Sequence, residues 1–119
     1  MVLYVKLDSH EWGVEDFTDE DALSLTGTIY SDRELSTAFD LTGYNLDFRM
    51  ISQGKITLDD NGEDTEIVTA ASGTFRYKPD NGKVVVEANG EVNIRLEKTG
   101  TQVSAVGVNG SADLHIKLV

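Results

Sequence analysis

The chain has 119 residues, of which 21 are acidic and 10 are basic, so its formal net charge is −11. A charge of that sign repels nucleic acid and anionic lipid and argues against direct binding to either; it favours solubility or adaptation to high salt. The absence of cysteine excludes disulfides, thiolate metal sites and cysteine nucleophiles. With 39% hydrophobic and 26% charged residues, the composition predicts one folded domain spanning residues 1–119.

The start of the chain alternates between apolar and polar residues and then turns acidic, unlike the basic-then-apolar layout of a signal peptide. No run approaches the roughly 20 apolar residues that a transmembrane helix needs. We therefore expect a protein that is made in the cytoplasm of its host and has no membrane partner.

Alternation of apolar and polar residues predicts β-strands along most of the chain. Leu46, Phe48 and Met50 are separated by single polar residues, which gives a strand with one buried face and one wet face. Such one-sided strands are typical of antiparallel sheets, since parallel strands read as continuous apolar runs. In chain order, strands are expected at 2–7, 23–30, 44–51, 54–58, 65–70, 73–78, 83–88, 91–98, 102–107 and 112–118.

Glycine-containing turn signals separate these predicted strands. Asn-Gly, which readily adopts the positive φ angles of a type I′ hairpin turn, occurs at 61–62, 81–82, 89–90 and 109–110. Gln-Gly at 53–54, Ser-Gly at 72–73 and Thr-Gly at 99–100 add further signals. Turn signals that recur every 8–12 residues or so predict an all-β sandwich or barrel.

Residues 8–22 interrupt the alternation and contain seven acids and Trp12. One interpretation is a solvated acidic loop or insertion that Trp12 pins to the sandwich. The other is a recognition loop. Both leave this segment outside the regular strands.

A cluster of acidic residues at 59–64 is the best metal candidate. Calcium binds clustered carboxylates on tight, glycine-bearing loops, and the weak candidate ligands are Asp59, Asp60, Glu63 and Asp64. Their spacing does not match an EF-hand, and a charged Asn-Gly hairpin tip explains them equally well. We therefore expect no metal and no other cofactor.

Catalytic motifs are also lacking. There is no G-x-S-x-G nucleophile elbow and no phosphate-binding glycine loop. The two histidines, His10 and His115, have no catalytic context, and with 21 acids some carboxylate pair falls near any chosen distance. We expect a protein that is not an enzyme.

Two groups of apolar residues are candidates for an interface or for recognition. The first is the continuous run Val84, Val85 and Val86, which reads as a strand buried on both faces, either within one chain or by a second chain. The second is a set of aromatic residues near the N-terminus that could stack on sugar rings: Tyr4, Trp12, Phe17 and Tyr30. A small sandwich also has edge strands, which invite pairing with a neighbour and favour homo-oligomers.

Four segments in order resemble a known family. The segment 39–50, FDLTGYNLDFRM, resembles the D-L-T-G-x-x-[VL]-x-[FL]-x-[ML] segment in the N-terminal domain of phage baseplate upper proteins. Residues 73–77 are similar to the family's G-x-[FVW]-x-Y strand, and residues 90–96 and 112–119 to its final hairpin and closing strand. The resemblance implies an immunoglobulin-like antiparallel β-sandwich in the tail or baseplate of a tailed virus, where this domain anchors to the particle.

The residues and the resemblance together predict a non-enzymatic structural protein of a tailed virus particle. It would lie in the tail, baseplate or host-attachment apparatus and would act through contacts with other virion proteins and with copies of itself. One alternative is a capsid surface decoration or turret protein. Another is a module that binds carbohydrate or a cell surface, with a host surface glycan as its partner.

Overall fold

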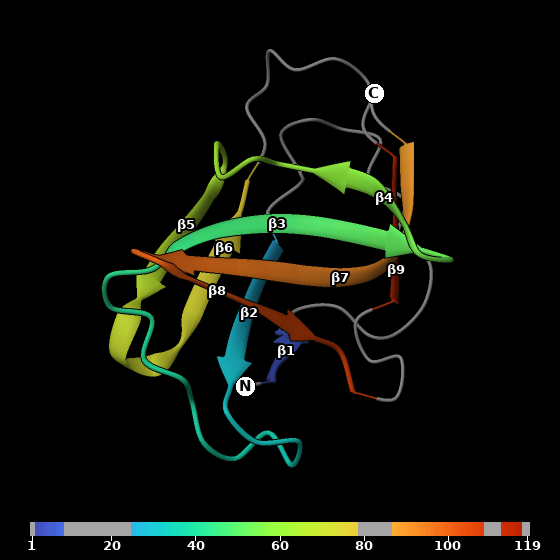
Figure 1. The fold of residues 1–119 in the computed structure, drawn as a ribbon. Coiled ribbons are helices and arrows are strands. Elements are labelled where there is room, and N and C mark those ends of the chain that lie inside the picture. The colour runs from blue at the N-terminus through green and yellow to red at the C-terminus, as the bar shows by residue number, and fades with distance from the viewer. Residues whose placement is uncertain (1, 9–24, 79–86, 109–112, 118–119) are drawn as a thin grey trace.

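The computed structural model describes residues 2–8, 25–78, 87–108 and 113–117. Within these ranges it contains nine strands and one short 3-10 helix, shown in Figure 1. The elements are β1 (Leu3–Leu7), β2 (Leu25–Tyr30), β3 (Asn45–Ser52), β4 (Lys55–Asp59), β5 (Thr65–Thr69), η1 (Ala70–Ser72), β6 (Thr74–Tyr77), β7 (Glu87–Lys98), β8 (Thr101–Val106) and β9 (Asp113–Lys117).

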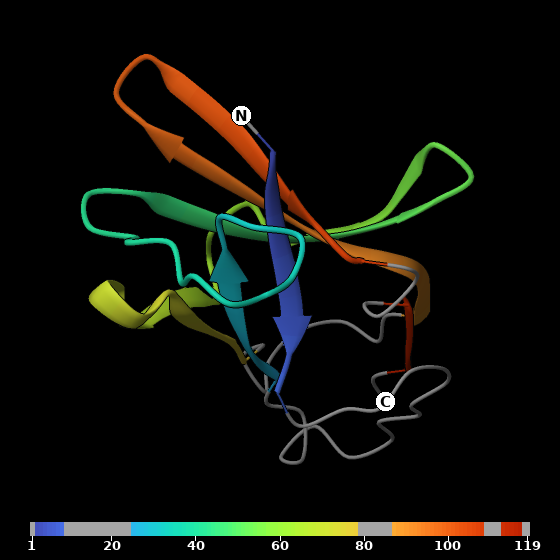
Figure 2. The same ribbon diagram turned by 90° about the horizontal axis from the view of Figure 1, so that it is seen from below.

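The strands pair in one ladder, in the order β4-β3-β7-β8-β1-β2-β6-β5, and β9 pairs with the first part of β7. Between β8 and β1 the ladder divides into two halves that lie over each other (Figures 1 and 2). One half, β8-β7-β3-β4, has the G-F-C-C′ strand order of an immunoglobulin domain, and the other, β1-β2-β6-β5, has the order A-B-E-D. The fold is therefore an immunoglobulin-like β-sandwich.

The first strand joins the two halves. β1 pairs antiparallel with β2, and Leu3 and Tyr4 also pair in parallel with Ala105 and Val106 of β8. The other strand pairs in the described ranges are antiparallel, as the one-sided alternation predicts. A strand that contacts both sheets forms a corner of the sandwich, and β1 has this position here.

The core lies between the two halves and is built from the apolar residues of the alternating strands. Phe48 of β3 and Tyr77 of β6 stack across it, with ring centroids 4.2 Å apart and ring planes 4° from parallel. Both side chains are buried, and burying an aromatic or aliphatic side chain of this size contributes about 1.5–3 kcal/mol. Other buried members are Leu3, Val5, Leu25, Ile29, Leu46, Met50, Phe75, Val92, Ile94 and Leu96.

Four of the predicted turns are confirmed, at 53–54, 61–62, 72–73 and 99–100, each of them between two strands. Asn61 and Gly62 have φ angles of 54° and 74°, and the Glu63 amide donates to the Asp60 carbonyl at 3.2 Å. Positive φ at two central residues is the mark of a type I′ turn. Residues 53–54 have the same signs of φ and join β3 directly to β4. The predicted turns at 81–82 and 109–110 lie outside the described residues.

The predicted turn at 89–90 is wrong, because β7 runs unbroken from Glu87 to Lys98. The two strands expected at 83–88 and 91–98 are therefore not separated there. Gly90 instead allows the backbone of β7 to lie close to that of β3. It has φ 137°, and a Cβ at this position would come within 2.6 Å of the carbonyl carbon of Ile51. Pairing with β3 on one side and β9 on the other holds this segment extended.

Candidate functional site

Asp47 is the most unusual polar residue of the described chain. It alternates with the core residues Leu46 and Phe48 of β3, and the alternation predicts that it faces water. It is nevertheless buried, with 4% of its surface exposed. A buried carboxylate is costly unless it is paired and hydrogen-bonded, so the prediction of a wet face fails at this position.

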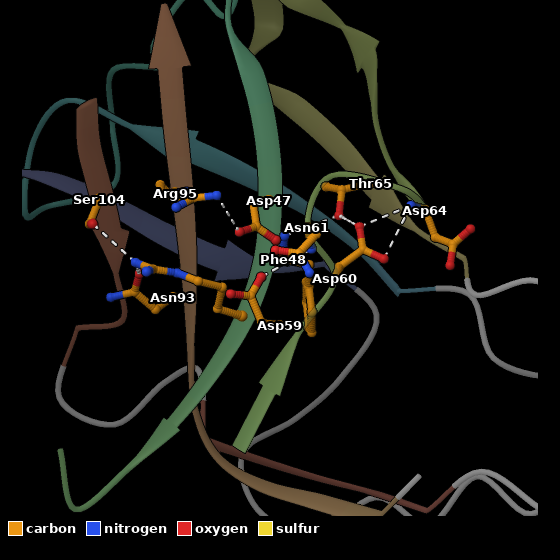
Figure 3. A network of polar contacts seen from close by, with 11 residues as sticks. Asp47, Phe48, Asp59, Asp60, Asn61, Asp64, Thr65, Asn93, Arg95 and Ser104 are labelled. Atoms are coloured by element: carbon orange, nitrogen blue, oxygen red, sulfur yellow. Dashed lines mark hydrogen bonds and ion pairs between the residues drawn. The ribbon is translucent and has the colours of Figure 1, made fainter. Parts of the chain in front are cut away.

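The loop between β4 and β5, residues 60–64, lies against this part of β3. The Asp60 amide donates to the Phe48 carbonyl at 3.0 Å, and the Phe48 amide donates to Thr65 Oγ1 at 3.1 Å. Gly62 lies so close that a Cβ would contact the Leu46 carbonyl oxygen at 3.4 Å. These contacts place the loop beside Asp47 and account for its burial (Figure 3).

Of the weak metal candidates Asp59, Asp60, Glu63 and Asp64, the first two use their carboxylates to hold this loop together. The Asp60 carboxylate accepts hydrogen bonds from the Asp64 amide, at 2.9 and 3.1 Å, and from Thr65 Oγ1, at 2.7 Å. Asp59 Oδ1 accepts from the Asn61 amide at 3.0 Å. Within the described ranges, no group of three or more acidic or histidine side chains is placed to hold a metal ion.

Asp47 lies next to one positive and one negative side chain. Arg95 Nη2 of β7 is 3.0 Å from Asp47 Oδ2, an ion pair shown in Figure 3. Burial raises the pKa of Asp47 to about 6, and the hydrogen bond and charge of Asp59 add to this rise, while Arg95 and the Gly62 amide oppose it. Burial also acts to raise the pKa of Asp59, but its hydrogen bond with Asp47 and the Asn61 amide lower it below its usual range. Of the two carboxyls, Asp47 therefore takes up a proton at the higher pH.

A second polar cluster lies beside this pair on the same sheet face. Arg49 of β3 donates from Nη2 to Asn93 Oδ1 of β7 and, at 3.3 Å, to Ser104 Oγ of β8. These contacts link three neighbouring strands (Figure 3). Register pairs Arg49 with Asp59 and with Asn93, so the cluster and the carboxyl pair adjoin each other.

A pocket of about 480 Å³ opens beside Asp47. Its polar lining comes from β3, β7, β5 and the loop between β4 and β5, and part of its wall is apolar. The lining residues are Tyr44, Asn45, Leu46, Asp47, Asn61, Gly62, Thr65, Ile67, Arg95 and Glu97. Sequence analysis missed both Asp47 and Arg95; an acid and a base at matching positions of two alternating strands were the available signal.

The structure brings together two of the predicted aromatic residues. Tyr4 and Tyr30 are register partners on β1 and β2, and both are partly exposed. Trp12, Phe17, Val84, Val85 and Val86 lie outside the described residues.

The two ends of the ladder each expose a large apolar side chain. Ile56 on β4 is 54% exposed and Val68 on β5 is 51% exposed. Within the described ranges, each of these strands has a neighbour on one side only.

Comparisons with known proteins identify no family for this chain. No family model matches the chain, and no curated protein matches it. Among solved structures, the chain is similar to the RIG-5 IG1 homodimer, with 8% identity over 96% of this chain and 98% of that one and a TM-score of 0.36. Among the described residues, no helix is long and apolar enough to cross a membrane.

Proposed function

We propose that this protein is a non-enzymatic structural component of a tailed virus particle, in its tail, baseplate or host-attachment apparatus. It works through contacts made by the edges of its sandwich with copies of itself and with other virion proteins. The resemblance to the baseplate upper protein domain supports this proposal. Its segments at 39–50, 73–77 and 90–96 contain most of β3, all of β6 and the middle of β7, and the segment 112–119 contains β9.

The observation that carries the proposal is the pair of edge strands β4 and β5. A sheet edge presents unpaired backbone N–H and C=O groups, and soluble proteins commonly protect it with charge. Here the edges carry charged residues, Lys55 and Asp59 on β4 and Glu66 on β5, but each also carries an apolar residue, Ile56 or Val68, that is about half exposed. A neighbouring chain that added a strand would pair the backbone groups and cover these side chains.

Light scattering of the purified chain at low and high salt tests self-assembly. We expect a defined oligomer that high salt strengthens, because salt screens repulsion between copies that each carry a charge of −11. Ile56→Lys and Val68→Lys should each lower the mass, whereas Gln102→Lys adds the same charge at an exposed position of β8 and should not. A monomer at every salt concentration would contradict edge-mediated self-assembly.

Fractionation of virus particles tests the location. Antibodies raised against the chain should detect it in the gradient fractions that contain intact, DNA-filled particles from a producing culture. Immunogold labelling of those fractions would then distinguish the tail from the capsid surface. Detection in the soluble fraction alone would refute the virion assignment.

A second candidate function, glycan binding, is favoured by the pairing of Tyr4 with Tyr30. Partly exposed aromatic side chains at paired positions of neighbouring strands are of the kind on which sugar rings stack. If this surface binds glycans, Tyr30→Ala will abolish binding on a glycan array and leave the unfolding midpoint within a few degrees of wild type. Equal binding by the variant and the wild type would exclude the candidate.

A further inference from the structure

The pocket beside Asp47 exists because β4 is short. β4 ends at Asp59, which pairs with Arg49, so the first half of β3 has no neighbouring strand on that side among the described residues. Residues of β3, β7, β5 and the loop at residues 60–64 line the open pocket of about 480 Å³ that remains there. This volume is within the roughly 300–1,000 Å³ range of sites that hold small molecules.

Asp47 lines this pocket without being accessible to a ligand. Only 4% of its surface is exposed, and its carboxyl already contacts Arg95, Asp59 and the Gly62 amide. The ion pair at 3.0 Å restrains the guanidinium of Arg95, which is itself part of the lining. The groups that a ligand can reach are therefore the polar side chains around Asp47.

Four polar side chains of the lining are open to a ligand. Arg95 is about one third exposed, and Asn45, Asn61 and Glu97 are exposed. Asn45 and Glu97 are register partners on β3 and β7, two residues along from the pair formed by Asp47 and Arg95, so the two pairs share one sheet face. These side chains offer donors from Arg95 and both amides, and acceptors from Glu97 and both amides.

This mixture of donors and acceptors selects an uncharged ligand with several hydroxyl groups. An anion would be repelled by Glu97 and by the net charge of −11, and a cation would be repelled by Arg95. An apolar ligand would bury the amide groups without hydrogen bonds, which is costly. A hydroxyl both donates and accepts, so neighbouring hydroxyls can satisfy an amide and a carboxylate together.

The apolar part of the lining indicates that the hydroxyls are carried on a ring. Tyr44 and Ile67 are partly exposed and line the same pocket. The C–H groups of a pyranose ring suit apolar side chains of this kind, while its hydroxyls reach the polar ones. We propose that this pocket binds a neutral pyranose sugar through the four open polar side chains and through Tyr44 and Ile67. The site goes beyond the virion assignment and does not include the pair Tyr4 and Tyr30.

An NMR titration of the ¹⁵N-labelled protein tests this site. The probes are the methyl pyranosides of glucose, galactose and mannose, with 2-methoxytetrahydropyran as the matched ring that lacks the hydroxyl groups. At least one pyranoside should shift the amide signals of Asn61, Gly62 and Thr65 in a saturable way, because these residues line the pocket. The ring without hydroxyls should leave these signals in place, because it cannot satisfy the polar lining.

Two variants complete the test. Asn45→Asp keeps the shape of an exposed side chain but replaces its amide donors with a carboxylate, and it should weaken binding by about tenfold. Gln53→Glu makes the same chemical change at an exposed turn position outside the pocket and should bind like wild type.

Three results would each overturn the proposal: no shift with any of the pyranosides, equal shifts with the ring that lacks hydroxyls, or equal affinity of the two variants. Shifts confined to Tyr4 and Tyr30 would also overturn it and would favour the other candidate glycan surface. Fractionation of virus particles reports on location alone, so failure of this site and failure of the virion assignment are seen separately.

Discussion

Asp47 and Arg95 are register partners on the antiparallel strands β3 and β7, and their side chains form an ion pair at 3.0 Å between Oδ2 and Nη2. Asp47 is buried, whereas Arg95 reaches solvent. The pair therefore does not fully compensate the burial of the carboxylate, and Asp47 keeps a raised pKa. The free energy of unfolding should therefore change with pH and with substitution of Asp47 or Arg95.

Asp47→Asn is expected to stabilise the protein by about 1–2 kcal/mol at pH 7.5. The pKa of Asp47 rises from 3.8 to about 6 on folding, so the folded protein binds the proton more tightly than the unfolded chain. The contribution of this proton to the free energy of unfolding is fully present below about pH 4 and is lost as pH rises through about 6. Urea unfolding between pH 4 and pH 7.5 should show this decline in wild type and a flatter curve in the variant; parallel curves would contradict it.

Arg95→Gln is expected to destabilise the protein by about 1–3 kcal/mol at pH 7.5, because it leaves a buried carboxylate without its counter-ion. At pH 5 the loss should be smaller, since Asp47 is then largely protonated. The double variant Asp47→Asn with Arg95→Gln should recover most of the stability. A loss that is equal at both pH values would show that Arg95 acts through packing alone.

Thr65→Val tests the attachment of the loop at residues 60–64. Thr65 Oγ1 accepts from the Phe48 amide and contacts the Asp60 carboxylate, so the substitution removes both contacts without changing the size of the side chain. The expected loss of unfolding free energy is about 1–3 kcal/mol. Thr101→Val at an exposed position of β8 is the control and should stay within about 0.5 kcal/mol of wild type.

Gly90→Ala is expected to cost about 3 kcal/mol or more, because the new Cβ meets the Ile51 carbonyl and the φ of 137° is strained for alanine. Gly54→Ala is the matched control. Gly54 has φ 78° and open space around its Cβ position, so only the cost of positive φ remains, about 1 kcal/mol. Thermal unfolding of the two variants compares these costs, and equal losses would argue against the close contact between β3 and β7.

Local sequence patterns predicted most of the strands, but they did not predict which Asn-Gly dipeptides form turns. Asn-Gly forms the expected turn at 61–62, where the chain leaves β4, yet the same dipeptide at 89–90 lies within β7. The difference is tertiary: strands β3 and β9 flank Gly90 and hold it extended. Pairing with neighbouring strands outweighs the local preference of Asn-Gly for a hairpin turn, and Gly90 keeps a positive φ within an extended strand.

The alternation of Leu46, Phe48 and Met50 with polar residues by itself determined that β3 has one core face, because side chains along a strand point to opposite sides. The same alternation assigned Asp47 to water. Only the tertiary structure decided that Asp47 is buried beside Arg95, since Thr65, 17 residues from Phe48, draws the loop at residues 60–64 against β3. Strand periodicity is a property of neighbouring residues, whereas burial of a polar side chain depends on which distant segment comes to cover it.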